Sequence, residues 1–224
     1  MYKSISYLLV FNLLFSQLFF SEYAEGSGYN KYLEIYNTSL NAINLGDYSL
    51  SSCSNGCNNN NSWDYVDNLT LDNISLESGE VFVVCHPSDD ADISIQSQCD
   101  QTFTYLSNGD DAFGLTNIST GEILDIIGDL GDDPGDGWSV AGISNGTKDH
   151  TIVRKIDVVS GNAGDWNLSA GTNVDDSEWI VLEQNEWSYV GFHPHDGLEG
   201  LTDDGGDDGG SSSSEICNDG IDND

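Results

Sequence analysis

The chain has 224 residues, of which 39 are Asp or Glu and 5 are Lys or Arg, giving a formal net charge of −34. This balance argues against nucleic-acid and anionic-lipid binding, because both need a basic surface that releases counterions from phosphates or headgroups. The hydrophobic fraction of 38% is too high for a wholly disordered acidic chain, so we expect one folded domain with acidic ends.

A signal segment is predicted over residues 1–17. Lys3 supplies one positive charge, and a mostly apolar stretch follows from Ile5 to Phe20. Asn12 and Gln17 interrupt this stretch, and an apolar segment of about a dozen residues is typical of secretory signals and falls short of the ~20 residues that span a bilayer. We therefore predict a secreted or cell-surface protein. The alternative is an uncleaved membrane anchor.

Short runs rich in β-branched and aromatic residues follow, separated by clusters of Gly, Asn, Asp and Ser. No segment keeps helical apolar spacing for the twelve or so positions that a stable helix needs. We therefore predict an all-β fold, an antiparallel β-sandwich, in which near-continuous apolar runs form central strands. Val81–Val84 and Ile123–Ile127 are such runs. The predicted strands are Tyr32–Tyr36, Asp47–Ser51, Leu69–Leu76, Glu80–Cys85, Ala112–Thr116, Ile123–Ile127, Thr151–Ile156 and Trp179–Leu182.

The strand Tyr32–Tyr36 alternates in character. Leu33 and Ile35 point to one face, while Tyr32, Glu34 and Tyr36 point to the other. Leu33 and Ile35 are therefore predicted core residues. The aromatic face is either a binding surface or a face covered by a loop.

Five cysteines occur, at positions 53, 57, 85, 99 and 217. The first four can pair in three ways, and no second cysteine knuckle or spaced histidine pair indicates zinc. We favour Cys53–Cys57 and Cys85–Cys99, which close loops worth about 2 and 3 kcal/mol in the chain-entropy model. Residues 53–63 should form a surface loop. Cys217 is left for a partner beyond residue 224 or in another molecule.

A series of sequence blocks covers about residues 18–195: Phe20–Ser27, Leu33–Asn37, Asn108–Ala112, Ile126–Gly128, Asp133–Gly135, Gly137–Trp138, Thr151–Lys155, Trp179 and Gly191–His193. In this order and spacing they resemble the lamin-tail domain, the module of nuclear lamins that also occurs in exported prokaryotic proteins. The resemblance implies an immunoglobulin-like β-sandwich used for surface or assembly contacts. It carries no catalytic residues over to this chain.

The segment from Asp132 to Trp138 combines one proline and two glycines, so we predict a turn that delivers Trp138 into the sandwich. Asp132, Asp133 and Asp136 form an acidic cluster there. Calcium would relieve their mutual repulsion, but a solvated turn is the favoured interpretation.

Arg154 and Lys155 are two of the few cations, and we expect them to pair with carboxylates across a strand rather than to bind a ligand. His193, His195 and Asp196 have the donor types of a zinc or copper site. Pro194 breaks regular strand pairing and no third ligand is placed by spacing, so a solvated terminal segment is favoured.

The composition changes abruptly near the C-terminus, where residues 196–214 form a predicted Asp/Gly/Ser linker. Residues 215–224 resemble the opening of the Asp-rich calcium repeats of thrombospondin type 3, which we expect to continue beyond residue 224. Asp219, Asp222 and Asp224 are the candidate calcium ligands, since calcium prefers several carboxylate oxygens. The alternative is an acidic disordered tail.

No nucleophile motif or phosphate-binding loop is present, so we predict a non-enzymatic module for binding or assembly outside the cell. Its partner would be a protein or a surface polysaccharide. Two alternatives stay open. The domain could be an accessory part of a larger secreted hydrolase, such as a nuclease or phosphatase, or a carbohydrate-binding module that uses Tyr32, Tyr36 or Trp63.

Overall fold

The β-rich pattern of the sequence gives twelve strands and two short helices in the computed structural model, which describes residues 17–58, 61–131 and 133–193. The prediction of a β domain with few helices is confirmed. The helices are α1 (Ile93–Gln96) and α2 (Trp166–Ala170), and a 3-10 helix, η1, spans Leu45–Asp47. The strands are β1 (Leu18–Glu25), β2 (Lys31–Asn37), β3 (Ile43–Asn44), β4 (Tyr48–Cys53), β5 (Tyr65–Thr70), β6 (Ser75–Leu76), β7 (Val81–Cys85), β8 (Gln101–Thr102), β9 (Ala112–Asn117), β10 (Ile123–Ile127), β11 (Thr151–Arg154) and β12 (Trp179–Leu182).

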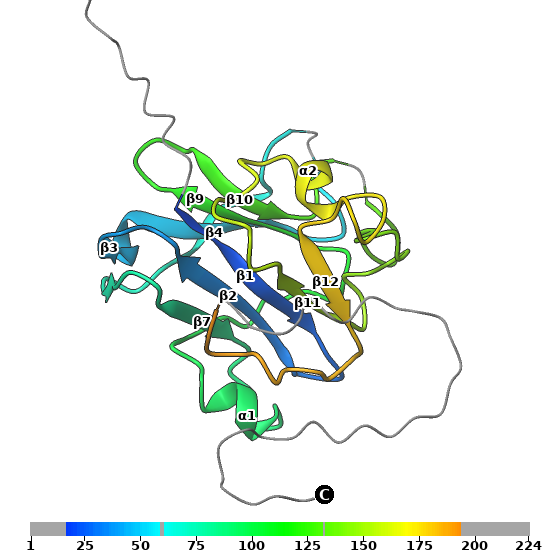
Figure 1. Ribbon diagram of the computed structural model, residues 1–224, viewed down its shortest axis with the longest axis horizontal. Coiled ribbons are helices and arrows are strands. Elements are labelled where there is room, and N and C mark those ends of the chain that lie inside the picture. The colour runs from blue at the N-terminus through cyan, green and yellow to red at the C-terminus, as the bar shows by residue number, and fades with distance from the viewer. Residues whose placement is uncertain (1–16, 59–60, 132, 194–224) are drawn as a thin grey trace, which may run out of the picture.

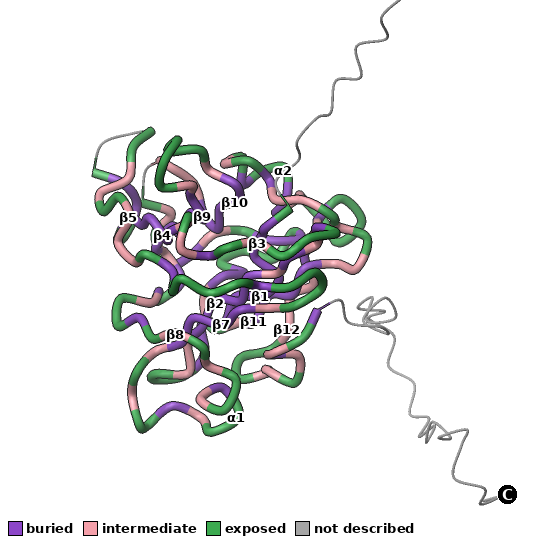
Figure 2. The backbone as a smooth tube through the Cα atoms, turned by 90° about the vertical axis from the view of Figure 1, so that its left-hand side faces the viewer, coloured by how far each residue is buried: buried purple, intermediate pink, exposed green. Residues whose placement is uncertain are grey.

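Two main sheets form the sandwich (Figure 1). The larger has six strands in the order β12-β11-β1-β2-β7-β8, and the smaller has four in the order β10-β9-β4-β5, while β3 and β6 form a separate short pair. Neighbouring strands are antiparallel except β7 and β8. Figure 2 shows the buried residues gathered along the strands, with exposed residues on the loops between them.

The main core combines side chains from both sheets. Leu33 and Ile35 of β2 are buried in one apolar cluster with Leu50 of β4 and Phe113 of β9. Full burial of a side chain of this kind contributes roughly 1.5–3 kcal/mol relative to exposure. The predicted core positions Leu33 and Ile35 are confirmed, and the antiparallel β-sandwich expected from the sequence is the observed architecture.

A β-bulge in β1 changes which side chains face the core. The register shifts between Phe20 and Glu22, so that Ser21 is an extra residue and Glu22 pairs with Glu34. Because one extra residue reverses the alternation of a strand, Phe20 and Tyr23 both lie in the main core. Glu22 lies on the opposite, outer face of the sheet. Without the bulge, its carboxylate would point into the core.

Two predicted strand boundaries are wrong. The run Leu69–Leu76 is divided, because β5 ends at Thr70 and a turn closed by the Ile74 N–H and the Asp72 carbonyl precedes β6. The run predicted over 151–156 ends at Arg154.

The prediction that Ile123–Ile127 is a central strand is also wrong, because β10 is the edge strand of the four-stranded sheet. The strand can be apolar because another segment of the chain covers its free edge. Asn162 bonds both the N–H and the carbonyl of Ile126, at 3.0 and 2.9 Å, and the Ala163 N–H donates to the Leu124 carbonyl. A covered edge needs no charged residues for protection. In contrast, β7 is an interior strand between β2 and β8, as predicted.

The loop after β4 folds back on the outer face of the four-stranded sheet. Trp63 packs over Gly114 of β9, where a Cβ atom would overlap the indole ring. Trp63 also contacts a small cluster of Cys53, Cys57 and Ala112. Trp138 packs against the same cluster, which confirms that the turn before it delivers this side chain into the fold.

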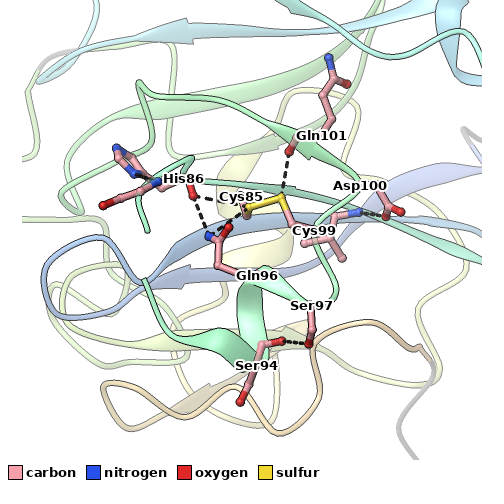
Figure 3. The surroundings of a disulfide bond; sticks show 10 residues. Cys85, His86, Ser94, Gln96, Ser97, Cys99, Asp100 and Gln101 are labelled. Carbon is pink, nitrogen blue, oxygen red and sulfur yellow. Dashed lines mark hydrogen bonds between the residues drawn. A yellow bond between two sulfur atoms is a disulfide. The ribbon is translucent and has the colours of Figure 1, made fainter. Parts of the chain in front are cut away.

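Both predicted disulfide bonds are present. Cys53–Cys57 closes the start of the loop after β4, with the Cα atoms 5.0 Å apart. Cys85–Cys99 joins the end of β7 to the segment after α1 (Figure 3). Beside it, Gln96 Nε2 donates to the His86 carbonyl at 2.8 Å. Two disulfides indicate an oxidising environment, in agreement with the predicted export. Within the described ranges, no helix has the length and apolar character needed to cross a bilayer.

Candidate functional site

A cleft opens at one end of the four-stranded sheet, where β4 ends and β5 and β9 begin. Its volume is about 350 Å³, near the lower end of the range for small-molecule sites. We call it the tyrosine cleft. It is lined by Ser52, Cys53 and Ser54 at the end of β4, by Tyr65 and Asn68 of β5, by Tyr105 and Asp111 of the loop before β9, and by Phe113 of β9.

Two tyrosines give the cleft its aromatic character. Tyr65 is 52% exposed and Tyr105 is 73% exposed, whereas Phe113 is fully buried. The Tyr105 ring packs edge-on against the buried Phe103, with the ring centroids 5.8 Å apart. Exposed tyrosines combine a flat apolar surface with a polar hydroxyl group. They therefore offer stacking surfaces to a ligand that has both apolar and polar parts.

The polar groups of the cleft are mostly uncharged. Asn68 Nδ2 donates to Ser52 Oγ at 2.9 Å, and the N–H of Asn55 donates to Asp111 Oδ1 at 2.9 Å. Serine hydroxyls and asparagine amides can both donate and accept hydrogen bonds. Groups of this kind suit ligand hydroxyls, which also do both, better than an ammonium or guanidinium group, which only donates.

The electrostatics of the cleft disfavour an anionic ligand. No Lys, Arg or His is present among the described residues that line it, and the whole chain carries a net charge of −34. Burial is the main cause that raises the pKa of Asp111, and the neighbouring Asp110 adds to it, while the N–H of Asn55 opposes both. The arrangement therefore favours a neutral ligand rich in hydroxyl groups.

The aromatic residues proposed from the sequence do not form an exposed surface. Tyr32 is buried, and its hydroxyl donates to Glu22 Oε1 at 2.5 Å. Tyr36 is half-buried and packs edge-on against the ring of His193, with centroids 4.7 Å apart. Trp63 is half-buried over the sheet. Of the two alternatives for this face, the covered face is confirmed at Tyr32, because Val190 and Trp187 near the end of the domain pack against it.

The predicted metal sites gain no support from the described residues. Lys148 Nζ donates to Asp136 Oδ1 at 2.7 Å, and Asp133 Oδ1 accepts from the Gly135 N–H, as in a solvated turn. No group of three or more His, Cys, Asp or Glu that could hold a metal ion occurs in residues 17–58, 61–131 and 133–193.

Several predicted ligands lie outside the described residues, namely Asp132, His195, Asp196, Asp219, Asp222 and Asp224. The same holds for residues 1–16 of the signal segment, for the linker and for Cys217. His193 is described and is buried beside the ring of Phe19, so the expectation of a solvated segment is wrong at this position.

The pairing predicted for Arg154 is confirmed, although its main partner lies elsewhere than expected. Its guanidinium donates to both carboxylate oxygens of Asp125, at 2.8 and 2.7 Å, and Asp125 belongs to β10 of the facing sheet. Glu178, beside β12, lies 3.3 Å from the same guanidinium. Lys155 instead donates to the carbonyl of Val174.

The residues of the tyrosine cleft were missed from the sequence. Tyr65 and Tyr105 stand beside polar residues such as Asp64 and Thr104, and aromatic residues in polar surface segments could have indicated contact sites. Their proximity could not be read from the sequence, because they are 40 positions apart and meet only through the order of β4, β5 and β9.

The comparisons with known proteins agree with the architecture. The family model described as Lamin Tail Domain matches residues 15–130, just over half of the chain. The match includes the strands from β1 to β10 and ends before β11 and β12, which complete the six-stranded sheet. No curated protein and no solved structure matches the chain.

Proposed function

The chain belongs to the lamin tail domain family, and we propose that it is a non-enzymatic, exported module that binds a neutral saccharide through the tyrosine cleft. Its role would be to hold the protein against a surface polysaccharide outside the cell. Export is supported by the two disulfide bonds.

The composition of the cleft carries this proposal. Two exposed tyrosines flank a hollow whose polar groups are two serine hydroxyls, one asparagine amide and one carboxylate. A sugar ring has an apolar face that stacks on an aromatic ring, and hydroxyl groups that pair with such side chains. The volume of about 350 Å³ limits the ligand to a small unit, such as one part of a longer glycan.

Binding without turnover is supported by the same residues. Glycoside hydrolysis usually needs two carboxyl groups about 5–10 Å apart, flanking the scissile bond. Asp111 is the single carboxylate among the described residues that line the cleft. An accessory role beside a secreted nuclease or phosphatase, and calcium binding by the C-terminal tail, stay predictions because both concern residues other than those described.

A glycan array followed by calorimetric titration of the exported protein tests the proposal. We expect a neutral oligosaccharide to bind, and Tyr65→Ala and Tyr105→Ala each to weaken its affinity about two- to tenfold, the value of one aromatic contact. Tyr29→Ala is the matched control, because Tyr29 is half-exposed and stacks on His86.

The proposal is overturned if no neutral glycan binds. It is also overturned if Tyr29→Ala weakens binding as much as the two cleft variants do. Product release from a bound glycan would remove the non-enzymatic part of the proposal and leave the saccharide site in place.

A further inference from the structure

The outer face of the six-stranded sheet carries two buried carboxyl groups. Glu22 of β1 and Glu34 of β2 are directly opposite each other in the strand register, and both are fully buried. Directly opposed residues of an antiparallel pair have Cβ atoms about 4.5–5.5 Å apart. We call these residues the acid pair. The β-bulge at Ser21 creates it by directing Glu22 to this face.

Residues 186–193, which we call the strap, cover the acid pair. After β12 the chain crosses the outer face of the sheet and ends beside β2 and β7 (Figure 1). Val190 is buried in an apolar cluster with Tyr32 and Val83, and Trp187 packs against this cluster. The strap is also tied directly to the acid pair, because the Gly191 N–H donates to Glu34 Oε2 at 2.7 Å.

Hydrogen bonds satisfy only part of the acid pair. Glu34 Oε1 accepts from Ser21 Oγ at 2.7 Å, and Glu22 Oε1 accepts from the Tyr32 hydroxyl at 2.5 Å. Glu22 Oε2 is buried with no hydrogen-bond partner in the described part of the chain. A buried acceptor of this kind is costly as an ion and is relieved by a proton.

Among the described residues, the titratable neighbours that shift the pKa values of the acid pair carry no positive charge. They are Tyr32 from β2, Glu186 from the strap and Asp100 from the segment before β8, all of which are acidic. His193, at the end of the strap, packs edge-on against the rings of Phe19 and Tyr36. Two opposed carboxyl groups without a cation cannot both ionise easily, because like charges in a buried site repel strongly.

We propose that the strap closes over the sheet while the acid pair holds a proton and opens as the pH rises. The strap and the acid pair together form a pH-dependent latch. Opening uncovers the two carboxyl groups together with Val83 and the ring of Tyr32, which the strap residue Val190 covers. The outer face of the sheet is therefore a covered surface in acidic surroundings and an accessible one in neutral to alkaline surroundings.

Proton linkage gives the direction of the effect. Burial raises the pKa of Glu34 from 4.5 to about 7, although the bonds from Ser21 and Gly191 oppose the increase. Burial and the nearby Glu34 raise the pKa of Glu22 well above its ordinary value. Once the strap opens, water reaches both groups and their pKa values fall towards normal. The closed state thus binds more protons, so its advantage is full below pH 4.5 and is lost as the pH rises through about 7.

Hydrogen exchange of the exported protein between pH 5 and 9, corrected for intrinsic exchange rates, measures strap opening. We expect the opening constant of residues 186–193 to rise by up to about tenfold per pH unit between 4.5 and 7, the slope for one proton. Amides of β1 and β2 should keep their protection, which separates local opening from global unfolding. Loss of protection in strap and sheet together would overturn the proposal.

Three variants complete the test. Glu34→Gln should make the opening constant of the strap less dependent on pH between 4.5 and 7. Glu122→Gln, at an exposed glutamate before β10, should leave that pH dependence unchanged. Gly191→Ala should open the strap even at pH 5, because Gly191 has φ +95° and a Cβ there would lie 2.5 Å from Gln98 Oε1. The latch is contradicted if the strap amides are equally protected at every pH. It is also contradicted if the opening constant of Glu34→Gln changes with pH as steeply as that of the unsubstituted protein.

Discussion

Two fully buried pairs of titratable side chains, Arg154 with Asp125 and Glu22 with Glu34, lie on opposite sides of the six-stranded sheet and are stabilised differently. Arg154 and Asp125 link the facing sheets, with the guanidinium stacked over the Trp179 ring at 4.2 Å and the carboxylate accepting the N–H groups of Phe20 and Asn162. Glu22 and Glu34 on the outer face have hydrogen bonds but no cation.

The difference shows what each pair can do. A buried ion pair whose carboxylate accepts bonds from the guanidinium and from two backbone N–H groups is costly to break, because removal of either partner leaves a buried charge unpaired. A buried pair of like charges depends on a bound proton, so its stability follows the pH. The first arrangement suits a fixed link between sheets, and the second suits a surface that changes.

The largest expected effect comes from breaking the interior pair. Arg154→Met leaves Asp125 buried without its cation, and we expect the free energy of unfolding to fall by about 3–5 kcal/mol. Urea denaturation at pH 7 measures the loss. Lys155→Met is the control, because the Lys155 ammonium donates only an exposed hydrogen bond, to the Val174 carbonyl, and the change should alter the stability by less than about 0.5 kcal/mol. Similar losses in the two variants would show that Arg154 is not a structural link.

A smaller effect is expected from the covalent link beside the outer face. Cys85 belongs to the apolar cluster beneath the strap, and its disulfide with Cys99 closes a loop with a sequence separation of 14. Replacing both residues by Ser should cost about 3 kcal/mol, against about 2 kcal/mol for the same change at Cys53 and Cys57. Urea denaturation of the two double variants compares them. The reverse order would mean that this face does not depend on its disulfide.

The smallest effect sharpens the comparison at the acid pair itself. Ser21→Ala removes the hydroxyl that donates to Glu34 Oε1. This hydrogen bond favours the ionised form of Glu34, so its loss should raise the pKa of Glu34 further. A carboxyl group whose pKa is raised in the folded state lowers the stability at pH values above its unfolded-state pKa. We therefore expect a loss of about 1 kcal/mol at pH 8, where Glu34 would otherwise ionise, and much less at pH 5. Thermal or urea unfolding at both pH values tests this, with the exposed Ser94→Ala as control. An equal loss at both pH values would argue that Ser21 acts through packing alone.

Local patterns predicted much of the fold. The alternation of Leu33 and Ile35 with polar neighbours identified core positions, and the spacing of four cysteines favoured the two disulfides that are observed. The edge position of β10 was not predictable in this way. Its apolar run is equally consistent with a central strand, and only the contact with Asn162, more than 30 positions later, shows why an edge strand can be so apolar.

The sequence by itself determined the all-β class, the acidic balance and the resemblance to the lamin tail domain, because each depends on composition, period or local order. Only the tertiary structure decided that Tyr32 is buried, that Tyr65 and Tyr105 share a cleft, and that Glu22 lies opposite Glu34. The physical reason is that these features depend on strand order and on a one-residue bulge. A bulge moves every following side chain to the other face, and the pattern of single residues does not reveal it.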